Sequence, residues 1–194
     1  MKYYTSDWHL FHKKIILYSK RPFHLADGSP DVETMNRTII DNINAVVGPD
    51  DELYLLGDVA FADARKTRSI MEQIVCQNIF LIPGNHDSDE IINLTRSDGS
   101  PMWKAVSPLM DIVDNGRRLV LCHYKFEVFN KAHYEQPKTA YQFYGHSHGN
   151  LPGNNQQIDV GVDCWDFKPI TLKQAEARMK TLPPYQMNDH HVRR

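Results

Sequence analysis

The chain has 194 residues, of which 41% are hydrophobic and 24% are charged, and its formal net charge is −2. This composition excludes a disordered chain and fits one globular domain with a substantial core. The near-neutral charge provides no basic field for long nucleic acid, so a small ligand is the expected partner. The three cysteines form no CxxC pair, which argues against a disulfide framework or a structural zinc knuckle and favours a reducing compartment.

The first residues resemble a strand, without the basic and apolar leader of a secretory signal. No apolar run approaches the roughly 20 residues that a membrane span requires. We therefore expect a cytoplasmic protein that does not associate with membranes. We also expect a single domain over residues 1–182 and a polar, flexible tail over residues 183–194, and the sequence predicts no oligomeric state.

Strands and helices are predicted to alternate along the chain. Apolar runs predict strands over residues 2–5, 53–56, 79–82, 119–121 and 141–144. Residues 10–28 are rich in loop signals, with a short helical piece. Ser29 is expected to be the N-cap of the next helix and Pro30 its first residue. The apolar face of this helix consists of Val32, Met35, Ile39, Ile43 and Val46, and Gly48-Pro49 ends it.

A second helix is predicted around Ile70, Met71, Ile74 and Val75. Beyond residue 95 the segments become shorter, with turn signals between the runs at 117–122, 141–144 and 157–162. This pattern favours an α/β fold of two mixed sheets packed face to face and flanked by helices over a simple βαβ repeat.

A polar motif follows each of the five predicted strands. In chain order the motifs are Asp7-Trp8-His9, Gly57-Asp58, Gly84-Asn85-His86-Asp87, Cys122-His123 and Gly145-His146-Ser147-His148-Gly149. Side chains from the ends of neighbouring strands can converge on one crevice, which is where open α/β sheets bind ligands. We therefore expect these motifs to form one site.

The residue types in these motifs are metal ligands. Asp7 and His9 are two positions apart, so both can point to one side, and Asp58 is suited to bridge two cations. An amide oxygen and further imidazoles are available from Asn85, His123, His146 and His148. Such mixed oxygen and nitrogen ligands suit zinc, manganese, iron or nickel rather than a thiolate site.

The ordered motifs resemble those of the calcineurin-like metallophosphoesterase superfamily over residues 7–149. A closer similarity, to the small cap-less members of bacteria and phages, lies in Ser6-Asp7-Trp8-His9, His12, Arg21-Pro22-Phe23, residues 44–50 and residues 161–165. The resemblance implies the metallophosphoesterase fold and two divalent metal ions, with manganese first and iron, zinc or nickel as alternatives. It assigns metal 1 to Asp7, His9, Asp58 and His148. It assigns metal 2 to Asp58, Asn85, His123 and His146.

The mechanism that the resemblance implies is in-line attack on phosphorus by a hydroxide shared between metals about 3.5 to 4 Å apart. His86 is then the general acid for the leaving oxygen, or a group that stabilises developing charge. Asp87 either orients His86 or caps a helix that follows it.

Two departures from the superfamily bear on the substrate. Its protein phosphatases carry GDxVDRG and RGNHE, whereas residues 57–62 and 83–87 here lack the aspartate partner of the catalytic histidine and both phosphate-binding arginines. This favours a phosphodiesterase or a small-molecule phosphatase. Arg21 and His12 are the predicted substitutes for substrate binding, and Lys125 and His133 are weaker candidates.

The resulting prediction is a metal-dependent phosphoric ester hydrolase that acts on a phosphodiester such as a nucleotide or cyclic nucleotide. A phosphomonoesterase and a non-catalytic metal-binding scaffold stay open as alternatives. His86 favours an enzyme, because a scaffold has no physical need for that imidazole. A nuclease is disfavoured by the net charge.

Overall fold

The structure is a computed structural model that describes residues 1–134 and 139–186. Most of the predicted tail, residues 187–194, lies outside the described residues. Its first part is hydrogen-bonded: the backbone N–H of Asn155 donates to the Pro183 carbonyl, and the N–H of Tyr185 donates to Asn155 Oδ1. None of the described helices has the length and apolar character needed to cross a bilayer.

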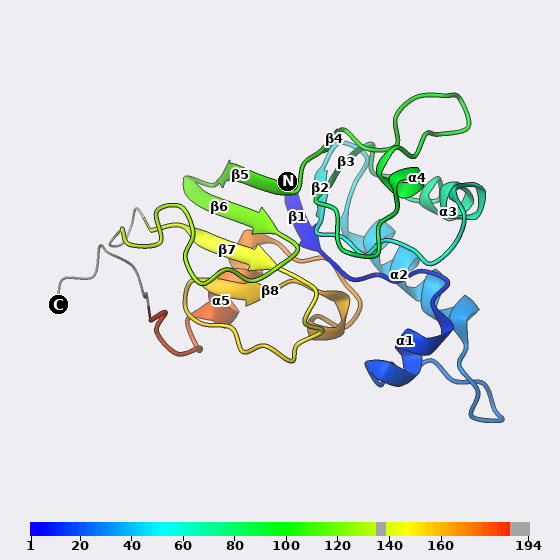
Figure 1. The fold of residues 1–194 in the computed structure, drawn as a ribbon, viewed down its shortest axis with the longest axis horizontal. Coiled ribbons are helices and arrows are strands. Elements are labelled where there is room, and N and C mark those ends of the chain that lie inside the picture. Colours follow the sequence, from blue (N-terminus) through cyan, green and yellow to red (C-terminus); the bar gives the residue numbers. More distant parts are fainter. Residues whose placement is uncertain (135–138, 187–194) are drawn as a thin grey trace.

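Two four-stranded sheets form the framework of the molecule (Figure 1). The first sheet is entirely parallel, with the order β1 (Lys2–Thr5), β2 (Glu52–Leu55), β3 (Asn78–Leu81), β4 (Ala105–Val106). The second has the order β5 (Leu109–Asp114), β6 (Arg117–Cys122), β7 (Tyr141–Tyr144), β8 (Gln157–Asp159). In it β5 is antiparallel to β6, and the other pairs are parallel. The predicted α/β fold with two sheets is confirmed, although only the second sheet is mixed.

The sheets pack face to face through alternate side chains of their strands. The ring of Tyr4 on β1 meets that of Phe143 on β7 edge to face, with centroids 4.9 Å apart. The buried cluster between the sheets also takes residues from β2, β6 and β8 and from the chain that directly follows β2 and β3: Tyr54, Leu56, Ile82, Leu119, Leu121 and Ile158. Because successive strand residues face opposite ways, Leu53 and Leu55 point to the other face of the first sheet.

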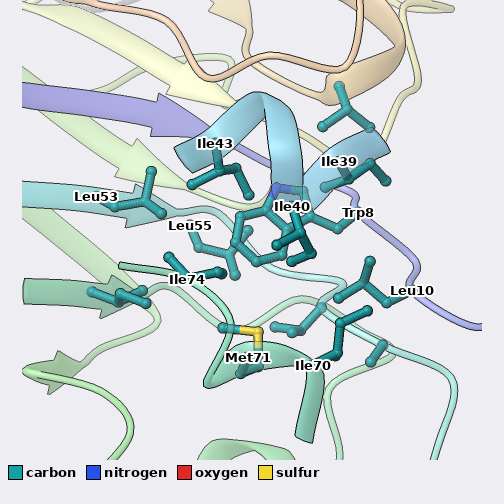
Figure 2. Close-up of a cluster of buried hydrophobic side chains, with 14 of the residues drawn as sticks. Trp8, Leu10, Ile39, Ile40, Ile43, Leu53, Leu55, Ile70, Met71 and Ile74 are labelled. Atoms are coloured by element: carbon teal, nitrogen blue, oxygen red, sulfur yellow. The ribbon is translucent and has the colours of Figure 1, made fainter. Parts of the chain in front are cut away.

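Helices cover that other face. α2 (Val32–Val46) and α3 (Ala64–Met71) enclose an apolar cluster in which Ile39, Ile40 and Ile43 lie near Trp8 (Figure 2). With both faces of the first sheet covered, its central strands appear in the sequence as continuous apolar runs. The same cluster buries Trp8, which follows β1, so the chain around Asp7 and His9 is anchored in the core.

The remaining helices are short. They are α1 (Lys13–Tyr18), α4 (Asp89–Ile92), η1 (Val162–Cys164) and α5 (Leu172–Met179). α1 is the short helical piece expected within residues 10–28. α5 contributes Leu172, Ala175 and Met179 to the cluster between the sheets. It is preceded by Ile170, which pairs with Tyr4 at the free edge of β1.

Two predicted helix boundaries are wrong. α2 begins at Val32 with Asp31 as its N-cap, whose side chain accepts the N–H of Thr34. Ser29 and Pro30 instead belong to a turn in which the N–H of Leu25 donates to the Ser29 carbonyl. The helix around Ile70 ends at Met71, so Ile74 and Val75 lie beyond it.

Candidate metal centre

Six strand ends supply the polar side chains of the site. The chain leaves β1, β2, β3, β6, β7 and β8 at the same edge of the two sheets, and backbone hydrogen bonds join the emerging segments. The N–H of Asp7 donates to Gly57, that of Gly145 to His123, and that of Val162 to Ser6. The last of these bonds connects the two sheets, so loops from both surround one point. This is the crevice expected at the carboxyl ends of parallel strands.

Two groups of metal-ligating side chains lie in this crevice. The first group is Asp7, His9 and His148, and the second group is Asp58, His123 and His146. Within each group the ligand atoms lie within 4.8 Å of one another. The site therefore contains side chains able to hold metal ions.

Asp58 belongs to the second group and also lies close to the first. Its Oδ2 is 3.4 Å from His9 Nε2 and 3.6 Å from His123 Nε2. Asn85 Oδ1 is 3.2 Å from His123 Nε2. All seven ligands predicted from the sequence are thus brought together, and Asp58 has the central position predicted for it.

Burial makes an ionised carboxylate at Asp7 unfavourable unless a cation compensates its charge. Asp7, His9, Asp58 and His123 are buried, whereas Asn85 and His146 are exposed at the opening. Burial raises the pKa of Asp7 to about 8 and lowers the pKa of His9 to about 2. Buried charges are normally paired or bound to metal, and a divalent cation would favour the ionised carboxylate and the neutral imidazole that act as ligands.

Glycines permit the close approach of these loops. A Cβ at Gly84 would lie 2.3 Å from Asp58 Oδ1, and one at Gly145 would lie 2.0 Å from Ser6 Oγ and 2.5 Å from Asp7 Oδ2. No side chain fits at such distances, so only glycine is accommodated. The glycines of the GNHD and GHSHG motifs therefore make room for the carboxylates.

The backbone of the site is held in an uncommon conformation. Five ligands have positive φ: Asp7 (59°), His9 (48°), Asp58 (55°), His146 (64°) and His148 (47°). Each such residue costs on the order of 1 kcal/mol, a cost that persists only where the surrounding structure enforces it. Concentration of this strain on the ligands is typical of a functional site.

Hydrogen bonds behind the ligands fix two imidazoles. His123 Nδ1 donates to the Leu56 carbonyl at 2.6 Å, and His148 Nδ1 donates to Asp163 Oδ2 at 2.6 Å. Both bonds place the proton of the neutral imidazole on Nδ1, so that Nε2 is the atom available to a metal ion. Such outer partners set the tautomer and orientation of metal-binding histidines.

Asp163 was not assigned a role from the sequence, and it is paired with Arg21. The guanidinium bonds both Asp163 oxygens at 2.8 Å and also donates to the Trp8 and Asp7 carbonyls. Burial would raise the pKa of Asp163, but the bonds from His148 and Arg21 outweigh it and hold the pKa below its usual value. Arg21 is only 1% exposed, so the prediction that it contacts substrate is wrong.

Two further carboxylates organise the loops. Asp87 accepts the backbone N–H groups of Asp58, Val59 and Gly84, and it therefore positions the loops rather than the His86 ring. The prediction that it caps the following helix is also wrong, because Ser88 is the N-cap of α4.

Asp159, which the sequence did not single out, accepts Ser147 Oγ and the N–H groups of Gly149 and Gly161. It thereby fixes the loop that carries His146 and His148. Asp159 is the last residue of the strand at 157–159, and Asp163 follows that strand, as the other motifs follow theirs. This position was the signal in the sequence that could have identified both aspartates.

The predicted catalytic imidazole lies at the opening. His86 is exposed, and its ring centroid is 5.8 Å from that of His9. Its backbone N–H donates to Asp58 Oδ1 at 3.0 Å. His12 caps α1 by accepting the Ile15 N–H, and its ring lies 5.7 Å from that of His9. His12 therefore stays close enough to the site to contact a substrate.

The two weaker phosphate candidates have other contacts. Lys125 Nζ donates to the Pro152 carbonyl and lies over the Tyr144 ring, and the His133 ring contacts that of Tyr134. Neither belongs to the two ligand groups.

Comparison with known proteins identifies a relative by sequence and a solved structure with a similar fold. No family model matches it. It is 30% identical over 179 residues to the uncharacterized protein MJ1445 of Methanocaldococcus jannaschii, covering 88% of this chain and 86% of that protein. The crystal structure of a protein of unknown function from Aquifex aeolicus, AQ665, superposes with a TM-score of 0.63 at 21% identity. That match covers 92% of this chain and 98% of the other, and it shows a common fold. The chain belongs to the family of the Methanocaldococcus jannaschii protein MJ1445.

Proposed function

We propose that this protein is a dinuclear metal-dependent phosphoric ester hydrolase of the calcineurin-like metallophosphoesterase type, acting on a small phosphodiester. The observation that carries the proposal is the pair of ligand groups with Asp58 between them and an exposed imidazole, His86, beside them. A scaffold that only bound metal would need the ligands but not His86.

One metal ion would be held by the first group together with Asp58, and a second by Asp58, His123, His146 and Asn85. Bound ions would supply a Lewis acid and lower the pKa of water near phosphorus. Imidazole, carboxylate and amide donors favour manganese, iron, zinc or nickel, and manganese is our first choice.

The side chains of the protein would donate the proton and orient the metal-binding imidazoles. His86 would donate a proton to the leaving oxygen; its backbone N–H donates to Asp58 Oδ1, and its side chain is exposed at the opening, which supports this role. A general acid of this kind typically contributes about 10²- to 10⁴-fold in rate. Asp163 and Leu56 hold the imidazoles of His148 and His123 in the tautomer that leaves Nε2 for the metal.

The charge of the site supports a diester substrate. Arg21 is engaged by internal acceptors, so it cannot grip a phosphate. A phosphodiester carries one negative charge and needs less compensation than a monoester, which carries about two near neutral pH. A diester such as a cyclic nucleotide therefore fits better than a phosphoprotein.

The test is hydrolysis of bis(p-nitrophenyl) phosphate, with p-nitrophenyl phosphate as the monoester comparison. We expect chelated protein to be inactive, manganese to restore turnover, and the diester to be preferred. Asp58→Asn should abolish turnover together with metal binding, and His86→Ala should lower turnover with metal content unchanged. His24→Ala, at an exposed histidine in the loop before α2, is the matched control. Metal-loaded protein that hydrolyses neither ester with manganese, iron, zinc or nickel would be a metal-binding scaffold.

A further inference from the structure

An exposed aromatic ring stands beside each ligand group. The Phe61 ring lies 5.6 Å from the His9 ring and 4.9 Å from the His86 ring. The Tyr124 ring lies 5.0 Å from that of His123 and 4.9 Å from that of His146. Phe61 is 41% exposed and Tyr124 is 44% exposed.

Both rings are fixed in place despite their exposure. The Phe61 ring packs edge to face on that of His12 with centroids 3.9 Å apart, and its N–H donates to the Leu10 carbonyl. The Tyr124 hydroxyl reaches Asn85 Oδ1 at 3.4 Å. A single exposed apolar side chain is common on protein surfaces. Here, in contrast, two held rings each lie against imidazoles of a different ligand group, Phe61 against His9 and Tyr124 against His123 and His146.

We propose that Phe61 and Tyr124 are stacking subsites for the two substituents of the phosphodiester, and that these substituents carry flat aromatic groups, as nucleosides do. The inference rests on the proposed function. A diester bound between the ligand groups extends one substituent toward each side. Aromatic side chains accept any nucleobase by stacking, because every base presents a π-face.

The position of His86 assigns the two sides. If His86 gives its proton to the leaving oxygen, the leaving group departs past the neighbouring Phe61 ring. The substituent that stays on phosphorus then lies on Tyr124, next to His146. The reaction breaks the bond between phosphorus and the leaving oxygen, adds water, and yields an alcohol on the Phe61 side and a monophosphate on the Tyr124 side.

The first experiment measures binding without turnover. Manganese-loaded protein is titrated with adenosine 5′-monophosphate and with ribose 5-phosphate in a calorimeter. We expect the nucleotide to bind about 5- to 150-fold more tightly, the range for one stacked base. Tyr124→Ala should remove this preference, whereas Tyr124→Phe, which keeps the ring, and Phe61→Leu should retain it. Equal affinity of the wild-type protein for both compounds would overturn the Tyr124 subsite.

The second experiment separates the two sides kinetically. Bis(p-nitrophenyl) phosphate has an aromatic group on both sides, whereas methyl p-nitrophenyl phosphate has one only on the leaving group. Phe61→Leu should raise KM for both diesters, and Tyr124→Leu should raise KM only for the first. Metal content, measured in each variant, should not change. Equal effects of both substitutions on both substrates would contradict the assignment of sides.

The two proposals fail in different ways. If no diester is hydrolysed but Tyr124→Ala still removes the nucleotide preference, the hydrolase proposal fails and the Tyr124 subsite stands. If hydrolysis depends on manganese but Tyr124→Ala keeps the nucleotide preference and neither Phe61→Leu nor Tyr124→Leu changes KM for either diester, the hydrolase stands and the stacking subsites are refuted.

Discussion

Replacing Arg21 by Met tests the finding that this arginine supports the metal centre from behind. The guanidinium is buried and bonds Asp163 through two contacts of 2.8 Å. It also donates to the carbonyls of Trp8 at 2.9 Å and Asp7 at 2.7 Å. Methionine has a similar apolar stem but no donor, so all four hydrogen bonds to oxygen would be lost.

The expected loss follows from these contacts. Removing one partner of a buried ion pair costs about 3 to 5 kcal/mol, since the other charge is left uncompensated. The carbonyls of Trp8 and Asp7, left without their donor, add to this cost, although such contributions do not sum independently. We therefore expect the free energy of unfolding to fall by at least about 3 kcal/mol, a large part of the roughly 5 to 15 kcal/mol of a typical domain.

The assay is urea unfolding of the metal-free protein. Arg21→Met should lower the midpoint, and the double substitution Arg21→Met with Asp163→Asn should recover part of the loss, because it removes the unpaired carboxylate. A loss below about 1 kcal/mol, the range of exposed ion pairs, would refute the reasoning. Unchanged stability together with a raised KM would restore Arg21 as a substrate contact.

Three further outcomes test other parts of the site. Asp163→Asn should weaken metal binding at the first group by about 10- to 100-fold, because His148 loses its charged partner, with binding at the second group unchanged in the same calorimetric titration. Gly145→Ala should destabilise the fold and abolish metal binding, since its Cβ would overlap Ser6 Oγ; Gly99→Ala, with nothing within 4 Å, should cost only about 1 kcal/mol by thermal unfolding. Manganese at about 100 times its Kd should add about 2.7 kcal/mol to the free energy of unfolding, and Asp58→Asn should remove that gain.

The clustering of the candidate ligands was predictable because strand ends are visible in the sequence. Asp7, Asp58 and His123 lie just after the ends of apolar runs, and parallel strands bring such ends together. The mixture of carboxylate, amide and imidazole side chains then indicates a metal site, even though the sequence gives no distances between them. The pairing of Arg21 with Asp163 carries no such mark, because the two residues are 142 positions apart and meet only in the folded chain.

Local signals failed where tertiary contacts overrode them. Ser29 and Pro30 have the right chemistry for a helix start, but pairing of this segment with His24 and Leu25 holds them in a turn, and Asp31 takes the cap. The strand β5 was missed because it pairs only with β6, lies at the edge of its sheet and exposes alternate residues. Its sequence therefore lacks the apolar run that marks the buried strands.

The most direct test of the two-metal account is anomalous diffraction from crystals of the manganese-loaded protein. We predict two anomalous peaks in each molecule, one among Asp7, His9 and His148 and one among Asp58, His123 and His146, with Asp58 contacting both. A single peak, or peaks away from these residues, would contradict a dinuclear centre.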